Sequence, residues 1–219
     1  MDFASSEIFR YLAQFAYEPL LVYGLIILLM TLSSFGLPFP EEVTLLSAGL
    51  LVFMGRHPDL YPPPYPGAPV VSLHITALVC FLAVFLSDYI VFMLGRKVGS
   101  KMLTGRFMQK MVKPEHMTKV SAFTGKYGAF ACGIFRFTPG IRFPGHFACG
   151  SVGIAPWKFI LVDGTAALVS VPTQVYLMGL YGEVILGFLK EIKLFLLYAV
   201  IGAFVFFLVR KFLRRPQTV

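Results

Sequence analysis

Two arginines stand at the break in an apolar segment of the chain, in GIFRFTPGIRFPGHFACG, residues 133–150. Arg136 and Arg142 are six residues apart, and each guanidinium stays charged at any relevant pH. An arginine at the centre of a membrane helix costs at least about 2.5–3.5 kcal/mol, so two of them need partners or water. Because a guanidinium fork matches phosphate oxygens bidentately, the pair indicates a phosphate-binding site.

A structural interpretation of the same arginines stays open. Glu42 and Asp88 are carboxylates in other apolar segments, and ion pairs with them would neutralise both arginines and hold the helices together. The phosphate interpretation has one further argument. A break in an apolar helical segment presents helix ends, whose free N–H groups favour anions.

Glu41 and Glu42 form the acidic counterpart in GLPFPEEVTLLSAG, residues 36–49. Two adjacent carboxylates away from water repel one another, and this favours proton uptake by at least one of them. They are therefore candidates for proton coupling. The alternative is that Pro40, Glu41 and Glu42 simply begin a helix, because acidic residues are favoured in its first turn.

Three more titratable residues are candidates for the same site. We expect Asp88 near the cytoplasmic end of a membrane helix and Asp163 early in the next one, where either residue pairs with an arginine or relays protons. Asp163, which precedes Gly164, equally fits a role in helix packing. His146 is a group that titrates near neutral pH, although a single histidine is more often an ordinary hydrogen-bonding residue.

The elements that position these residues follow from composition. The chain has 219 residues, 57% of them hydrophobic and 14% charged. A soluble domain is about a quarter charged, so this is an all-α integral membrane protein with a single membrane domain, 1–219. A membrane-spanning helix needs about 20 apolar residues. Three stretches have this length: 74–94, 158–180 and 192–209.

Two other apolar segments, 19–54 and 127–156, are interrupted by proline and glycine. Each half is too short to cross a bilayer, so we expect both segments to be re-entrant helical hairpins. The backbone of the two tips is assigned to Pro38, Pro40, Pro139, Gly140 and Pro144. Offsetting the chain by 104 residues places 36–49 over 140–153 with five identities, and Glu42 then falls on His146. Opposed hairpins of this kind are typical of inverted-repeat transporters, whose substrate site lies between the repeats.

Charge predicts the orientation. The basic segment 95–126 and the tail 210–219 are expected on the cytoplasmic side, and 55–72 outside. The N-terminal segment 1–18, whose charged residues are mostly acidic, is expected to form an interfacial helix. This topology accounts for the net charge of +8, so nucleic acid is not an expected partner. The expected partners are membrane lipids, with a homo-oligomer left open.

Motifs for enzymatic chemistry are absent from the sequence. It contains no P-loop, zinc-ligand spacing, dinucleotide fingerprint or nucleophile elbow. We therefore expect a transporter rather than an enzyme, with no cofactor and no metal.

Four stretches together resemble the DedA family of membrane proteins, also called the SNARE-associated or VTT-domain family. They are PFPEE, SDYIVFMLGRKVG, FRFTPGIRFPGHFACG and WKFILVDGTAALV, within residues 20–180. The resemblance implies a multi-pass protein of the bacterial cytoplasmic (inner) membrane that moves lipids, above all undecaprenyl phosphate, between leaflets. It implies proton coupling through Glu42 and Asp88, and phosphate binding by Arg136 and Arg142.

Two positions depart from the family pattern: Ser87 stands where the family has glycine before the aspartate, and the second departure matters more. Many members have an acidic residue just before the P-x-P-x-E turn, where this chain has Ser33. Either Glu41 compensates for it, or proton coupling is weaker or absent and the protein is a scramblase. Two other functions remain open: a proton-coupled transporter or exchanger of small ions or solutes, and a non-transporting scaffold for envelope assembly.

Overall fold

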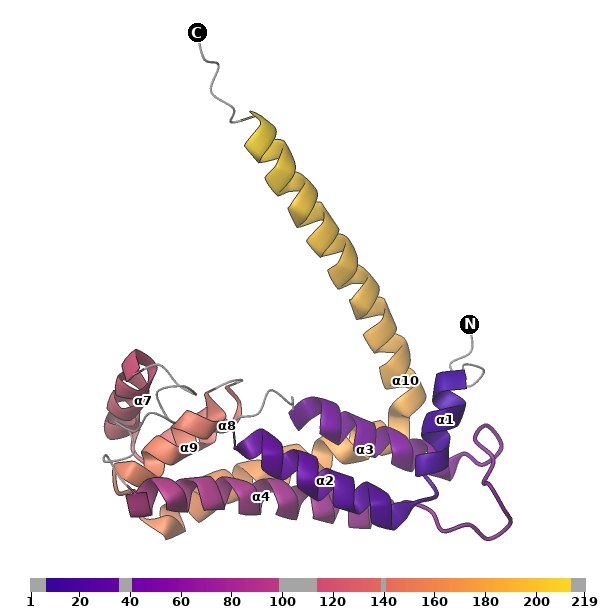
Figure 1. Ribbon diagram of the computed structural model, residues 1–219, viewed down its shortest axis with the longest axis horizontal. Helices are drawn as coiled ribbons and strands as arrows, with labels where there is room; N and C mark the ends of the chain where they lie inside the picture. The colour runs from indigo at the N-terminus through magenta and orange to yellow at the C-terminus, as the bar shows by residue number, and fades with distance from the viewer. Residues whose placement is uncertain (1–6, 36–40, 99–113, 139–140, 214–219) are drawn as a thin grey trace. The chain divides into compact units, whose positions relative to one another are not determined.

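The computed structural model describes residues 7–35, 41–98, 114–138 and 141–213 (Figure 1). Within these ranges the chain is helical apart from turns and the 57–72 loop, and it contains no strand, so the predicted all-α class is confirmed. The chain forms two compact units. One comprises Met1–Leu180 and holds the candidate site, and the other comprises Tyr181–Val219.

The first interrupted segment folds as two helices, α2 (Pro19–Ser34) and α3 (Glu41–Arg56), which contact one another. Pro19 lies in the first turn of α2, where its missing N–H is not needed. The helix before them, α1 (Glu7–Phe15), lies within the 1–18 segment predicted to be helical. The predicted interruption is confirmed, whereas Pro38 and Pro40 themselves lie outside the described residues.

The second interrupted segment also folds as two short helices, α8 (Phe130–Arg136) and α9 (Arg142–Ser151). Arg136 is therefore the last residue of α8, and Arg142 is the first residue of α9. Pro144 is buried in the first turn of α9, while Pro139 and Gly140 lie outside the described residues. A helix pair at each predicted place is confirmed. The re-entrant depth of the pairs and their inverted repeat stay predictions.

Two helices in the described part of the chain are long and apolar enough to cross a membrane: Leu73–Val98, which is α4, and Pro156–Ile185. The latter belongs to α10 (Pro156–Leu213), which is interrupted at Tyr181, where φ is −120° and ψ is 27°. The predicted spans 158–180 and 192–209 lie on either side of this break. The span 158–180 lies within Pro156–Ile185, whereas the span 192–209 stays a prediction.

The segment predicted as a basic surface stretch, 95–126, is partly helical. α4 continues to Val98, four residues beyond its predicted end, and carries Arg96 and Lys97 in its last turn. Cations are favoured there by the helix dipole, and Arg96 also donates to the carbonyl of Ile154 at 2.7 Å. A further helix, α7 (Pro114–Tyr127), contacts α8 and α9.

Two apolar clusters lie along α4. One joins α2, α3, α4 and α10 through residues such as Val22, Leu45, Val84 and Val171. The other joins α4, α7, α8, α9 and α10 through residues such as Phe92, Val120, Phe135, Phe147 and Phe159. Asp88 lies on α4 between the parts of the helix that enter each cluster. The candidate site is therefore at the junction of the two clusters.

The contact between α4 and α9, which lie side by side in Figure 1, depends on glycine. Gly150 approaches α4 so closely that a Cβ atom there would overlap the carbonyl of Phe92, and one at Gly95 would overlap the carbonyl of Phe147. Because no other residue lacks a Cβ, this approach requires glycine on both helices. It brings the start of α9, with Arg142 and His146, against the part of α4 that carries Asp88.

Candidate functional site

Arg136 is held between two aspartates from two other helices. At the end of α8, it donates from Nε to Oδ1 of Asp163 at 2.9 Å and from Nη2 to Oδ2 of Asp163 at 2.8 Å. The same Nη2 lies 2.6 Å from Oδ2 of Asp88. The side chain is only 3% exposed, and Nη1 has no hydrogen-bond partner in the described part of the chain. A buried guanidinium is thus fixed on one side and unpaired on the other.

Arg142 joins three helices at the start of α9. Its Nε donates to Oδ1 of Asp88 at 3.1 Å, and its Nη2 lies 2.5 Å from Oδ2 of the same residue. Its Nη1 forms an ion pair with Glu41, the first residue of α3. The side chains of Arg142 and Glu41 are 15% and 11% exposed, so this ion pair is the shallower part of the site.

Asp88 is the shared acceptor. Its Oδ2 lies within 2.6 Å of a nitrogen from each arginine, and its Oδ1 accepts a hydrogen bond from Ser34 at 3.2 Å. The residue follows Leu73 by 15 positions and precedes Val98 by 10 positions. At 1.5 Å per residue these are about 22 and 15 Å along α4. Asp88 is thus closer to the end of α4 than to its start, but farther from the end than predicted, because α4 continues beyond residue 94.

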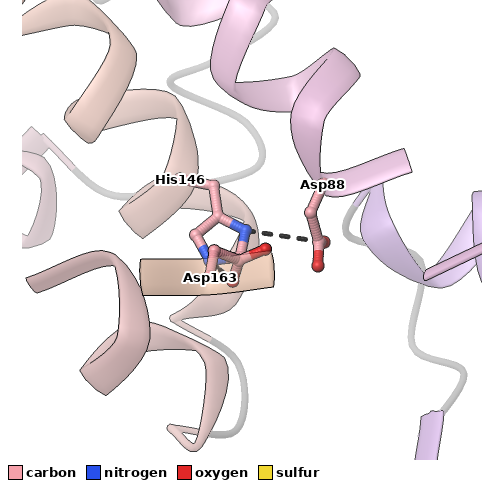
Figure 2. Close-up of side chains that lie close together, drawn as sticks. All are labelled: Asp88, His146 and Asp163. Carbon is pink, nitrogen blue, oxygen red and sulfur yellow. Dashed lines mark ion pairs between the residues drawn. The ribbon is translucent and has the colours of Figure 1, made fainter. Parts of the chain in front are cut away.

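His146 is fully buried between the two aspartates. Its Nδ1 lies 3.5 Å from Oδ1 of Asp88, and its Nε2 lies 3.3 Å from Oδ1 of Asp163. Figure 2 shows the ring beside Asp163, with one nitrogen directed at Asp88. The edge of the ring meets Phe159, with centroids 5.3 Å apart. Asp163 and His146, which the sequence offered only as secondary candidates, are therefore central to the cluster.

The two glutamates at the start of α3 differ in position. Glu41 contacts Arg142, whereas Glu42 is exposed and forms no ion pair with another described residue. The contact with an arginine that was predicted for Glu42 is instead made by Glu41. Successive residues of a helix point about 100° apart, so only one of the two can face α9.

One polar residue of the site was missed by the sequence interpretation. Ser34 ends α2 and is buried, and its hydroxyl lies 2.8 Å from that of Ser87 and 3.2 Å from Oδ1 of Asp88. The family resemblance singles out the neighbouring Ser33, which stands at the position of the family acid. The signal for Ser34 was its place at the end of an apolar helix, where a buried hydroxyl needs a partner.

The cluster has ligand atoms at metal-like spacing but not the chemistry of a metal site. Asp88, His146 and Asp163 offer ligand atoms within 4.8 Å of one another. The carboxylate oxygens, however, already accept hydrogen bonds from two guanidinium groups, whose positive charges repel a cation. The residues present therefore do not fit a metal ion, and the cluster is a set of buried ion pairs.

The family model of the VTT domain matches residues 39–180, which contain every residue of the cluster except Ser34. An uncharacterised membrane protein of Haemophilus influenzae is 30% identical over 156 residues, 71% of this chain and 68% of the relative. The uncharacterised membrane protein YbfM of Bacillus subtilis is 29% identical over 132 residues, 60% of this chain and 71% of the relative. No solved structure matches the chain. The chain therefore belongs to the VTT-domain family of membrane proteins, the DedA family.

Proposed function

We propose that this protein is a lipid translocase that moves a phosphate-bearing lipid between membrane leaflets. The observation that supports it is that the two buried aspartates bind only part of each guanidinium group. Asp88 and Asp163 accept hydrogen bonds from Nε and Nη2 of both arginines. Among the described residues, the Nη1 atom of Arg136 has no partner, and the Nη1 atom of Arg142 has only the more exposed Glu41 as a partner.

These two Nη1 groups would form the phosphate site. Both Nη2 atoms lie within 2.6 Å of the same oxygen of Asp88, so the guanidinium groups are neighbours. A phosphate that replaced Glu41 on Arg142 could also accept from Arg136, which has a buried donor to satisfy. Charge-assisted hydrogen bonds to phosphate are among the strongest in proteins, and a buried donor without a partner costs about 1–3 kcal/mol. The exchange therefore favours binding of the anion.

The same exchange offers a route to proton coupling. Glu41 would lose its cation when phosphate takes Arg142, and a carboxylate without its cation binds a proton more readily. Lipid binding and proton uptake would then occur together, without a separate proton path. On this proposal Glu41 carries the proton, and it also fills the role of the family acid whose place is taken by Ser33.

A lipid, rather than a free ion, fits the surroundings of the shallow ion pair. Ile141 directly precedes Arg142 and is 38% exposed. Apolar side chains exposed next to a charged site suit a ligand with a polar head and an apolar chain. We propose undecaprenyl phosphate as this ligand on the family resemblance, and the bacterial cytoplasmic membrane, crossed several times, as the location.

A structural function of the ion pairs is the alternative that the geometry itself raises. Arg136 and Arg142 link α3, α4, α8, α9 and α10, as a scaffold would require. Removing a link would then lower stability without any specific effect on lipid movement. Transport therefore has to be measured on variants that stay folded.

Proteoliposomes that contain the purified protein and labelled undecaprenyl phosphate provide the test. We expect the wild type to move the label faster than protein-free vesicles and to respond to a pH gradient. Glu41→Gln should lose that response, while Glu42→Gln, the matched control on the next residue, should keep it. A phospholipid label in parallel vesicles tests the choice of lipid. A wild type no faster than empty vesicles, or two glutamate variants that behave alike, would contradict the proposal.

A further inference from the structure

We propose that His146 is a permanently charged imidazolium and the third cation of the site, and that this charge allows a phosphate to enter. The second half of this inference rests on the proposed function. The first half concerns the protonation of one buried ring and stands on its contacts alone.

The contacts of Nε2 require a proton on that nitrogen. It lies 3.3 Å from Oδ1 of Asp163 and 3.3 Å from the carbonyl oxygen of Cys132. Both oxygens are acceptors, and Asp163 is ionised because it accepts two hydrogen bonds from Arg136. A lone pair on Nε2 would face two lone-pair-bearing oxygens in a buried site, which is repulsive. The hydrogen is therefore on Nε2.

The contacts of Nδ1 favour a second proton. Its nearest charged neighbour is Oδ1 of Asp88 at 3.5 Å, and it has no hydrogen-bond partner in the described part of the chain. In a neutral ring Nδ1 would carry a lone pair directed toward a carboxylate (Figure 2). A proton there turns that repulsion into an attraction between the ring and the carboxylate. The ring with a hydrogen on both nitrogens is the imidazolium.

The charge of the whole cluster favours the same form. The charged or titratable groups of the cluster are Glu41 on α3, Asp88 on α4, Cys132 and Arg136 on α8, Arg142 on α9 and Asp163 on α10. Three carboxylates against two guanidinium groups leave a net charge of −1 with a neutral ring. The imidazolium brings the total to zero, and a buried cluster without net charge avoids an uncompensated desolvation penalty.

A neutral cluster can accept an anion, whereas a negative one repels it. When Glu41 leaves with a proton and a singly charged phosphate takes its place, the charge stays at zero. With a neutral ring the same exchange would leave a net charge of −1 around the bound phosphate. His146 is thus a positioning and charge-balancing residue, since its contacts are with Asp88 and Asp163 rather than with the proposed ligand.

Nitrogen NMR of the full-length protein in nanodiscs, labelled with ¹⁵N at histidine, measures the charge state directly. The other histidines are His57, His74 and His116, and the spectrum of His146→Gln identifies the signals of His146. An ordinary histidine, with a pKa of about 6.5, is mostly neutral at about pH 7.5. We expect both ring nitrogens of His146 to carry protons at this pH. A ring with one protonated and one bare nitrogen would overturn the inference, and this measurement on the wild type does not depend on the folding of any variant.

Transport in proteoliposomes tests the consequence. We expect His146→Gln to move labelled undecaprenyl phosphate at least about tenfold more slowly than the wild type. His74→Gln is the matched control, because His74 bonds to Tyr176 outside the cluster. An imidazolium in a protein that moves no lipid would refute the proposed function but not the charge of His146. Lipid movement by a protein with a neutral ring would refute the inference but not the function.

Discussion

The substitution Asp163→Asn removes one charge from the deepest ion pair and keeps the shape of the side chain. Asp163 is fully buried and accepts two hydrogen bonds from Arg136, at 2.9 and 2.8 Å. An asparagine has only one oxygen for these two donors, and its NH₂ group would face Arg136 or His146. The guanidinium would then share Asp88 with Arg142 as its only charged partner in the described part of the chain.

The size of the effect follows from burial. Breaking a buried ion pair by removing one partner costs about 3–5 kcal/mol, because the remaining charge stays away from water. For a domain of this length each kcal/mol lowers the melting temperature by about 2–4 °C, so we expect a decrease of roughly 6–20 °C. Glu41→Gln breaks the shallower ion pair, whose side chains are 11% and 15% exposed. A hydrogen bond to a charged group that water can partly replace is worth about 1.5–3 kcal/mol at most, which gives a smaller decrease.

Thermal unfolding of the purified protein in one detergent, followed by scanning fluorimetry, measures both variants. Asp59→Asn is the control, because Asp59 is exposed in the 57–72 loop and its substitution should change stability by less than about 0.5 kcal/mol. Adding Arg136→Gln to Asp163→Asn removes the stranded charge, so the double variant should lose less than the sum of the single losses. Equal melting temperatures for Asp163→Asn and the wild type, or strictly additive losses, would refute the buried-pair account.

Three further predictions concern the site, the packing and the topology. Arg136→Lys should slow lipid movement at least about tenfold despite keeping the charge, because an ammonium cannot bridge two aspartates as a guanidinium does; the proteoliposome assay measures it. Gly150→Ala should lower the melting temperature, since a Cβ there overlaps α4 at a cost of about 1–3 kcal/mol, whereas Gly24→Ala, with open space around it, should not. Cysteines introduced at Tyr65 and Lys119 should react with an impermeant thiol reagent from the outside and the cytoplasmic side respectively; labelling of both from one side would contradict the predicted topology.

Local chemistry made the helix breaks predictable from the sequence. Proline and glycine interrupt both apolar segments, and the structure has a helix end and a helix start at each place. The cost of buried charge likewise singled out Arg136, Arg142 and Asp88, all of which the structure brings together. These predictions succeed because each depends on one residue type and one penalty, independent of the rest of the fold.

The pairing of the charges was not predictable in the same way. Glu41 and Glu42 are the same residue type at adjacent positions, and the rotation of α3 about its axis decides which one meets α9. Packing of Leu45, Ala48 and Val52 against the first apolar cluster sets that rotation. The central place of Asp163 depends in the same way on how α10 packs, through Phe159 and Val171, against both clusters. Tertiary packing, rather than any local pattern, thus selects the partners.

The position of the cluster bears on why it exists. Replacing buried ion pairs by apolar side chains of similar volume is often neutral or stabilising, so stability alone does not explain five charged groups at the junction of two apolar clusters. Asp88 is the acceptor that both arginines share, and it lies deep in a helix long enough to cross a membrane. The depth of burial then divides the cluster into two parts. Asp88, Asp163 and Arg136 form the buried core, while Glu41 and Arg142 form a more exposed edge. On the proposed function, this edge exchanges one anion for another while the core holds its geometry, as a binding site for a charged head group requires.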